Sequence, residues 1–139
     1  MSIPSFRDIL AEMLTTPADS AFSDRIRDRA NWTCEICHKQ YYPPTNGLQC
    51  SHFWGRDYWS VRFDPDNALA ACAHCHFMLG DSPDYHTSVF RERLGEERYN
   101  ALRDRAYDPA LAKKYRQTKG VGKIAKWYRE CETPQIFVV

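Results

Sequence analysis

The chain contains no long apolar run. Its 139 residues are 43% hydrophobic, yet no stretch approaches the roughly 20 apolar residues that a membrane-spanning helix needs. The opening residues, MSIPSFRDILAEML, include acidic side chains and do not follow the basic-then-apolar order of a secretory signal. These absences exclude membrane-embedded and exported classes, and we expect a cytoplasmic (intracellular) protein with no membrane partner.

Internal repeats and low-complexity tracts are also missing. The aromatic content of 14% is too high for a disordered chain. The length fits one domain over residues 1–139. We expect N-terminal helices in residues 1–30, a metal-clamped core in residues 31–80 and a helical C-terminal extension in residues 81–139. The fold class predicted is α+β.

An overall charge surplus is lacking, because the net charge is only +1. Locally, residues 111–129 contain seven basic residues and no acid. Such a local cluster is typical of a phosphate-binding face, and interleaved aromatics (Tyr115, Trp127, Tyr128) favour DNA contact. A solvated helix face is the open alternative. The predicted DNA-binding residues here are Lys113, Lys114, Arg116, Lys119, Lys123 and Lys126.

Cysteine, in contrast, is present in a revealing arrangement. Four of the six cysteines form two Cys-x-x-Cys pairs, Cys34 with Cys37 and Cys72 with Cys75. Without an export signal, paired knuckles indicate a metal site rather than disulfides. Four thiolates complete a closed tetrahedron, so we predict a structural Zn²⁺ that supplies folding free energy on the order of 10 kcal/mol. The remaining two, Cys50 and Cys131, are expected to be small buried hydrophobes.

The two knuckles enclose 34 residues. Within this insert we expect a strand at 48–54, a turn at 55–57, a returning strand at 58–63 and a tight turn at 64–67. A helix follows at 74–79. Elsewhere, helices are predicted at 3–14, 23–29, 82–94 (ended by Gly95), 96–106, 109–118 and 121–132.

Three polar residues in and after the insert suggest chemistry: His52, Asn67 and His76. Hydrolysis of a phosphodiester requires an activated water and a Lewis acid on the phosphate. A histidine with a near-neutral pKa is a suitable general base for that water, and we assign this role to His52. Taken alone, His52 is also compatible with a half-buried structural role. Arg56, beside the predicted turn, is either a phosphate contact or a solvated turn residue.

The order Cys34-x-x-Cys37, Ser51-His52, Asp66-Asn67 and Cys72-x-x-Cys75-His76 resembles HNH (ββα-metal, His-Me finger) endonucleases with a Cys₄ zinc. Residues 48–56 are similar to the phage NinG (Rap) recombination family, and the overall pattern is similar to endonuclease VII-type nucleases. The resemblance covers about residues 25–94. It implies a ββα-metal core in which His52 is the general base, His76 binds the catalytic metal and Asn67 braces the loop. We therefore expect His52 and His76 to face each other across one common cleft.

One position departs from that resemblance. Where endonuclease VII-like proteins have a metal-binding carboxylate, this chain has Ser51, a weak ligand. Either the metal retains more waters or another carboxylate replaces the missing one, with Asp57 and Asp64 as candidates. We expect Mg²⁺ or Mn²⁺ as the catalytic metal, with other divalent ions accepted.

The sequence therefore predicts a metal-dependent DNA endonuclease. A non-catalytic, zinc-stabilised DNA-binding or recombination accessory protein is the main alternative. A branched-DNA resolvase is the other, and it would require a homodimer, since two strands must be cut.

Overall fold

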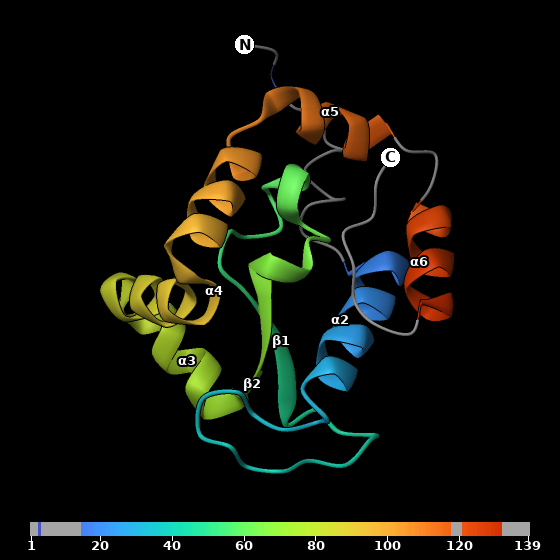
Figure 1. Ribbon diagram of the computed structural model, residues 1–139. Coiled ribbons are helices and arrows are strands. Elements are labelled where there is room, and N and C mark those ends of the chain that lie inside the picture. Colours follow the sequence, from blue (N-terminus) through green and yellow to red (C-terminus); the bar gives the residue numbers. More distant parts are fainter. Residues whose placement is uncertain (1–2, 4–14, 118–120, 132–139) are drawn as a thin grey trace.

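The computed structural model describes residues 3, 15–117 and 121–131. The fold is α+β: a two-stranded antiparallel sheet lies between two groups of helices (Figure 1). Helices α3 and α4 lie on one side of the sheet, and helices α2 and α6 lie on the other. The predicted helix at 3–14 falls outside the described residues. The elements in chain order are α2 (Pro17–Arg29), β1 (Leu48–His52), β2 (Ala68–Cys72), α3 (Ala73–Asp81), α4 (Pro83–Ala106), α5 (Pro109–Gln117) and α6 (Val121–Glu130).

Helix α2 begins earlier than predicted because Thr16 and Asp19 form a capping box. The Thr16 hydroxyl accepts from the Asp19 backbone N–H at 3.2 Å, and the Asp19 carboxylate accepts from the Thr16 backbone N–H at 2.8 Å. Pro17 occupies the first helical turn, where its missing N–H costs nothing. The predicted start at residue 23 was wrong, since Pro17 opens this helix. Phe22 and Ile26 are fully buried along it.

The sheet pairs β1 with β2, and Cys50 lies opposite Ala70. All five residues of β2 are buried, because helices cover both faces of the sheet. The returning strand predicted at 58–63 was wrong: Trp59–Val61 forms a 3₁₀ turn, and the chain returns only at Ala68. The aromatic and β-branched side chains of that segment fill the core instead, where Trp59, Val61 and Phe63 are buried.

Helix α3 follows β2 directly, so the central order is strand, strand, helix. Helix α4 starts at the Ser82 cap, whose hydroxyl accepts from the Tyr85 N–H at 3.3 Å. It breaks at Gly95, where φ is 77° and ψ is 164°, at the point where the sequence predicted a stop. The helices predicted at 109–118 and 121–132 correspond to α5 and α6 within a few residues.

None of the helices described has the length and apolar character required to cross a membrane.

Candidate functional site

The four knuckle cysteines converge as the sequence predicts. Their sulfur atoms all lie within 4.8 Å of one another, and the Cys37 and Cys72 sulfurs are 3.8 Å apart. A tetrahedron with Zn–S bonds of about 2.3 Å has edges of about 3.8 Å. All four cysteines are free thiols. The donor set therefore fits a structural zinc ion with no open coordination position.

Backbone N–H groups surround these sulfurs. The N–H groups of Cys37 and Cys72 donate to the Cys34 sulfur at 3.4 and 3.3 Å, and the N–H of Cys75 donates to the Cys72 sulfur at 3.4 Å. Burial raises the pKa of the Cys34 thiol, but these backbone donors outweigh burial and bring its pKa down to about 7. The backbone thus favours the thiolate form at Cys34, whereas neighbouring cysteines and burial raise the pKa of Cys37 and Cys75 in the metal-free cluster.

The zinc cluster lies at one end of the hairpin and His52 at the other. Cys72 pairs with Leu48 at the first end of β1, whereas His52 pairs with Ala68 at the second. The zinc cluster can therefore fix the near end of the hairpin, but the His52 end must be held by other contacts.

The His52 ring points from β1 toward helix α2. Its centroid is 5.7 Å from that of Phe22, and its Nε2 atom lies 3.1 Å from the backbone oxygen of Arg62. A carbonyl oxygen only accepts hydrogen bonds, so Nε2 carries the proton and Nδ1 has the free lone pair. Burial lowers the pKa of His52 to about 4. The imidazole is therefore neutral at pH 7.

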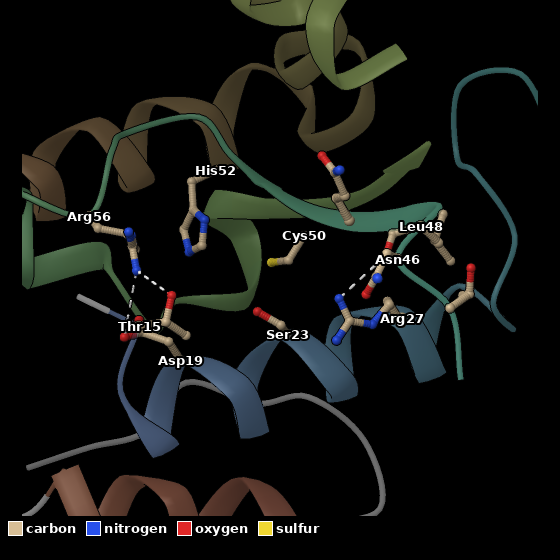
Figure 2. A pocket seen from close by; sticks show the side chains of 11 residues that line it. Thr15, Asp19, Ser23, Arg27, Asn46, Leu48, Cys50, His52 and Arg56 are labelled. Atoms are coloured by element: carbon tan, nitrogen blue, oxygen red, sulfur yellow. Dashed lines mark hydrogen bonds and ion pairs between the residues drawn. The ribbon is translucent and has the colours of Figure 1, made fainter. Parts of the chain in front are cut away.

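A cavity of about 410 Å³ lies between α2 and β1 with His52 on its wall. Figure 2 shows Arg56 toward one end, Arg27 toward the other, and Cys50 and Ser23 between them. We call this the His52 pocket. It was not predicted from the sequence, because one of its walls comes from the α2 residues Asp19, Ser23 and Arg27, which lie far from the motif in the sequence.

Two guanidinium groups give the His52 pocket a cationic character. Arg56 donates to the Thr15 hydroxyl at 3.2 Å and lies 4.0 Å from the Asp19 carboxylate. Arg27 donates to Asp24 at 2.7 Å, while its buried Nε–H has no hydrogen-bond acceptor among the described residues. The Arg56 side chain is 32% exposed, so a ligand can reach it.

Arg62 holds His52 through its own backbone. Its side chain is fully buried and donates to both carboxylate oxygens of Asp19, at 3.0 and 2.8 Å. The guanidinium also lies 4.3 Å from the ring centroid of Trp59. This pair joins α2 to the loop that carries the His52 acceptor. Sequence reasoning did not identify Asp19, because its only local signal was the helix cap.

Asn67 is fully buried and ties together the loop between the strands. Its side-chain oxygen accepts from the Trp54 N–H at 2.8 Å, and its amide nitrogen donates to the carbonyls of Trp54 and Val61 at 2.9 and 3.0 Å. Both ends of residues 53–67 are thus fixed to one side chain.

His76 lies on α3, and its Nδ1 atom is 2.5 Å from the Gln49 side-chain oxygen. It borders a separate cavity of about 400 Å³ with Phe77 and Asp81, which we call the His76 pocket. Residues alternate across a strand, so Gln49 and Ser51 face α3 whereas Cys50 and His52 face α2. The expected single cleft shared by His52 and His76 was therefore wrong, although Gln49 borders both pockets.

The two carboxylates considered as replacements for Ser51 do not reach the His76 pocket. Asp64 is buried in an ion pair with Arg105 at 2.7 Å, and Asp57 is exposed in a turn. Ser51 itself is buried, and its hydroxyl has no partner within the part of the chain that the structure describes. An unsatisfied hydroxyl on the same strand face as Gln49 is compatible with a bound ion or water.

Helices α5 and α6 present an exposed basic surface. Tyr115 and Tyr128 are buried beneath it, and the Tyr128 hydroxyl donates to the Phe63 carbonyl. These two tyrosines are therefore unavailable for the stacking on DNA that the sequence suggested. Lys119 lies outside the described residues. The exposed cations are Lys113, Lys114, Arg116, Lys123, Lys126 and Arg129.

Comparisons with family models, with curated proteins and with solved structures found no match for this chain.

Proposed function

We propose that the chain is a divalent-metal-dependent DNA endonuclease of the ββα-metal type. The observation that carries this proposal is the state of His52: the Arg62 carbonyl fixes its Nε2 proton, so that Nδ1 is a proton acceptor on the wall of a cationic pocket. The order β1, β2, α3, with His52 ending the first strand and His76 in the helix, supports the same assignment.

His52 takes a proton from the attacking water at Nδ1. Because the ring is held before substrate arrives, little reorganisation is needed at the moment of reaction. A histidine with a pKa of about 4 is always unprotonated at neutral pH but is a weak base. A phosphodiester anion entering the pocket favours the protonated ring and so raises this pKa toward neutrality.

Arg56 and Arg27 bind the phosphate backbone on either side of His52 (Figure 2). Guanidinium groups donate two parallel hydrogen bonds to a phosphate, which fixes the orientation of the strand. The further cations on α5 and α6 supply sequence-independent attraction to DNA.

His52 and His76 border separate pockets on opposite faces of β1. The proposal therefore requires the substrate to reach both pockets. Gln49 borders both pockets along β1, whose outer edge pairs with no other strand in the described residues. The proposal puts the scissile phosphate across this edge, with His52 on the side of the attacking water.

His76 and Ser51 would hold the catalytic ion. The Gln49 side-chain oxygen accepts a hydrogen bond from Nδ1–H of His76, which leaves Nε2 as a ligand atom. A divalent ion bound there, Mg²⁺ or Mn²⁺, would supply Lewis-acid stabilisation of the charge on the departing 3′ oxygen. By resemblance to the HNH family, the products carry 5′ phosphates.

A plasmid assay tests the proposal. Zinc-loaded protein is incubated with supercoiled DNA and Mg²⁺ or Mn²⁺, or with no added divalent ion. We expect nicking that needs the added ion and falls at least about 100-fold in His52→Ala, since general-base catalysis contributes about 10² to 10⁴. His74→Ala, an exposed histidine on α3, is the matched control and retains activity.

A second candidate is a zinc-stabilised DNA-binding accessory protein without catalysis. The observation that favours it is Ser51, which stands where a metal-binding carboxylate is expected. Binding of DNA by wild-type protein without cleavage, with every divalent ion tried and on both plasmid and four-way-junction DNA, overturns the nuclease proposal in favour of this one.

A further inference from the structure

A further cavity adjoins the His52 pocket toward the C-terminal end of α2. Its volume is about 390 Å³, and it lies between α2 and the loop that precedes β1. Trp32 forms part of its wall, and we call it the Trp32 pocket. Arg27 and Thr45 line both this cavity and the His52 pocket, so the two cavities meet at these residues.

The indole of Trp32 is held in place from several directions. Its Nε1–H donates to the Asp28 carboxylate at 2.9 Å, and the central carbon of the Arg27 guanidinium lies 5.4 Å from its ring centroid. The backbone N–H of Trp32 donates to the Arg27 carbonyl at 2.9 Å, and its carbonyl accepts from the Tyr41 N–H at 2.8 Å. These contacts fix the plane of the ring before any ligand arrives.

The backbone of Trp32 is in the left-handed region, with φ at 55°, and the preceding Asn31 has φ at 52°. A bulky side chain rarely adopts this conformation, because its Cβ comes too close to the neighbouring carbonyl oxygen. Residues of this kind concentrate at ligand sites, where the surrounding structure compensates for the strain. The fold thus accepts a strained backbone at the residue whose indole lines the cavity.

The two adjoining cavities differ in the charge that they accept. Arg56 and Arg27 give the His52 pocket its cationic character, whereas the carboxylates of Asp24 and Asp28 line the Trp32 pocket. Both carboxylates are substantially exposed, so a ligand can reach their oxygens. They repel a phosphate. An uncharged planar ring with N–H groups can instead stack on the indole and donate hydrogen bonds to the carboxylates. A nucleobase is a ring of this kind.

We propose that the Trp32 pocket binds one unpaired nucleobase of the DNA strand whose phosphate occupies the His52 pocket. Pro43 and Pro44 supply rigid apolar surface in the same cavity. Only an unpaired base fits, because stacking and pairing cover the face and the edge of a base within a duplex. The position of the cleaved phosphate rests on the proposed function, but binding of the base requires no catalysis.

Arg27 lies where the phosphate-accepting and base-accepting cavities meet. Its guanidinium donates to the Asp24 carboxylate at 2.7 Å and to the Leu48 carbonyl at 3.5 Å, which hold it between α2 and β1. A strand that runs from the His52 pocket to the Trp32 pocket must pass this guanidinium, which is suited to contact the phosphate between them. The substrate class that follows is DNA with an unpaired base beside the cleaved bond, in contrast to uniform duplex.

Binding of the base can be measured without cleavage. Zinc-loaded protein, with no Mg²⁺ or Mn²⁺ added, is titrated into three fluorescently labelled probes: a single-stranded oligonucleotide, the same strand in a blunt duplex, and a strand of equal length made of abasic sugars. Fluorescence anisotropy gives the affinities. We expect Trp32→Ala to bind the single strand at least about fivefold more weakly, since base stacking on an aromatic side chain contributes that much. Its affinities for the duplex and the abasic strand should equal those of wild type.

Two further variants isolate the aromatic face. Trp32→Phe retains a ring for stacking and should keep most of the affinity for the single strand. Tyr42→Ala is the matched control, because Tyr42 is 77% exposed in the same loop as Pro43 and does not line the Trp32 pocket. It should bind all three probes as wild type does.

Equal affinity of wild type and Trp32→Ala for the single strand overturns the inference, as does an equal loss of affinity for the abasic strand. A measurement on wild type alone covers a variant that does not fold: photo-cross-linking of a single strand that contains 5-iodouracil must label Trp32, and cross-links only outside the Trp32 pocket overturn the inference. Trp32-dependent binding without cleavage of any DNA tried defeats the proposed function and leaves the base site standing. Plasmid nicking that requires His52, with unaltered single-strand binding by Trp32→Ala, does the reverse.

Discussion

The two faces of strand β1 differ in how their polar groups are satisfied. On the α2 face, His52 and the Asp19–Arg62 pair have hydrogen-bond partners at 2.8–3.1 Å. On the α3 and α4 face, Ser51 and His86 contain buried polar atoms without partners in the described structure. The α2 face is not fully satisfied either, because the buried Nε–H of Arg27 in the His52 pocket has no acceptor among the described residues. The two faces therefore differ in the kind of group left without a partner: a cationic donor on the α2 face, and a hydroxyl and an imidazole nitrogen on the other.

Loss of zinc should lower the stability of the protein more than any other change considered, because it affects both faces of β1. Cys75→Ser removes one of four thiolates, and we expect the folded state to lose much of the roughly 10 kcal/mol that zinc binding contributes. Circular dichroism during thermal unfolding, with and without a zinc chelator, measures this loss. Cys131→Ser, which changes a thiol remote from the cluster, is the control and should alter stability little. Equal stability of the two variants would contradict a structural zinc.

On the α2 face, a single isosteric substitution at Asp19 should lower the free energy of unfolding strongly. Asp19→Asn leaves the fully buried Arg62 guanidinium without its counter-charge, and breaking such a pair costs about 3–5 kcal/mol. Urea denaturation at pH 7 gives the loss in unfolding free energy. Asp24→Asn removes the more exposed partner of Arg27 and should cost less than about 1 kcal/mol. Similar losses for the two would show that Asp19 has no special role.

The pH dependence of stability should report on His52. Its pKa is about 4 in the folded protein, below the ordinary value of 6.5, so the unfolded chain binds a proton first as pH falls. The stabilisation is therefore complete above pH 6.5 and is lost between pH 6.5 and 4, by about 3 kcal/mol in total. Urea denaturation of wild type and His52→Gln at pH 7 and pH 4.5 measures it. Parallel pH curves for the two proteins would exclude this assignment.

Substitutions on the basic helices α5 and α6 should have the smallest effect. This effect concerns DNA affinity and neither face of β1. Replacing Lys123 and Lys126 by glutamine removes two exposed cations from α6. If both contact phosphates, the slope of log affinity against log salt should decrease by about 2, with no change in zinc content. Fluorescence anisotropy on duplex DNA at several salt concentrations measures the slope. An unchanged slope would identify these lysines as a solvated helix face.

The parts of the fold that local chemistry specifies were predictable. The knuckles, the helix after Cys72 and the break at Gly95 all depend on spacing or on one residue type. The returning strand was not predictable, since residues 58–63 have strand propensity but are drawn into the core by Trp59, Arg62 and Phe63. The predicted helix boundaries were wrong where a proline can either begin or end a helix, as at Pro17.

The site was predictable only residue by residue. Ser51 and His52 are neighbours on a strand, so their opposite orientation follows from strand geometry alone, and the single cleft was an error of reasoning rather than of information. The contributions of Asp19 and Arg27 depend on tertiary contacts across long sequence separations. No local pattern marks them.

The hairpin is anchored asymmetrically, with four sulfurs at its Leu48 end and with hydrogen bonds, ring packing on Phe22 and the Asp19–Arg62 ion pair at its His52 end. The metal-clamped end can therefore hold the hairpin while the His52 end depends on the loop between the strands. Because Trp59, Val61 and Phe63 of that loop are buried, tolerance to substitution should be confined to its exposed positions, Gly55 and Asp57.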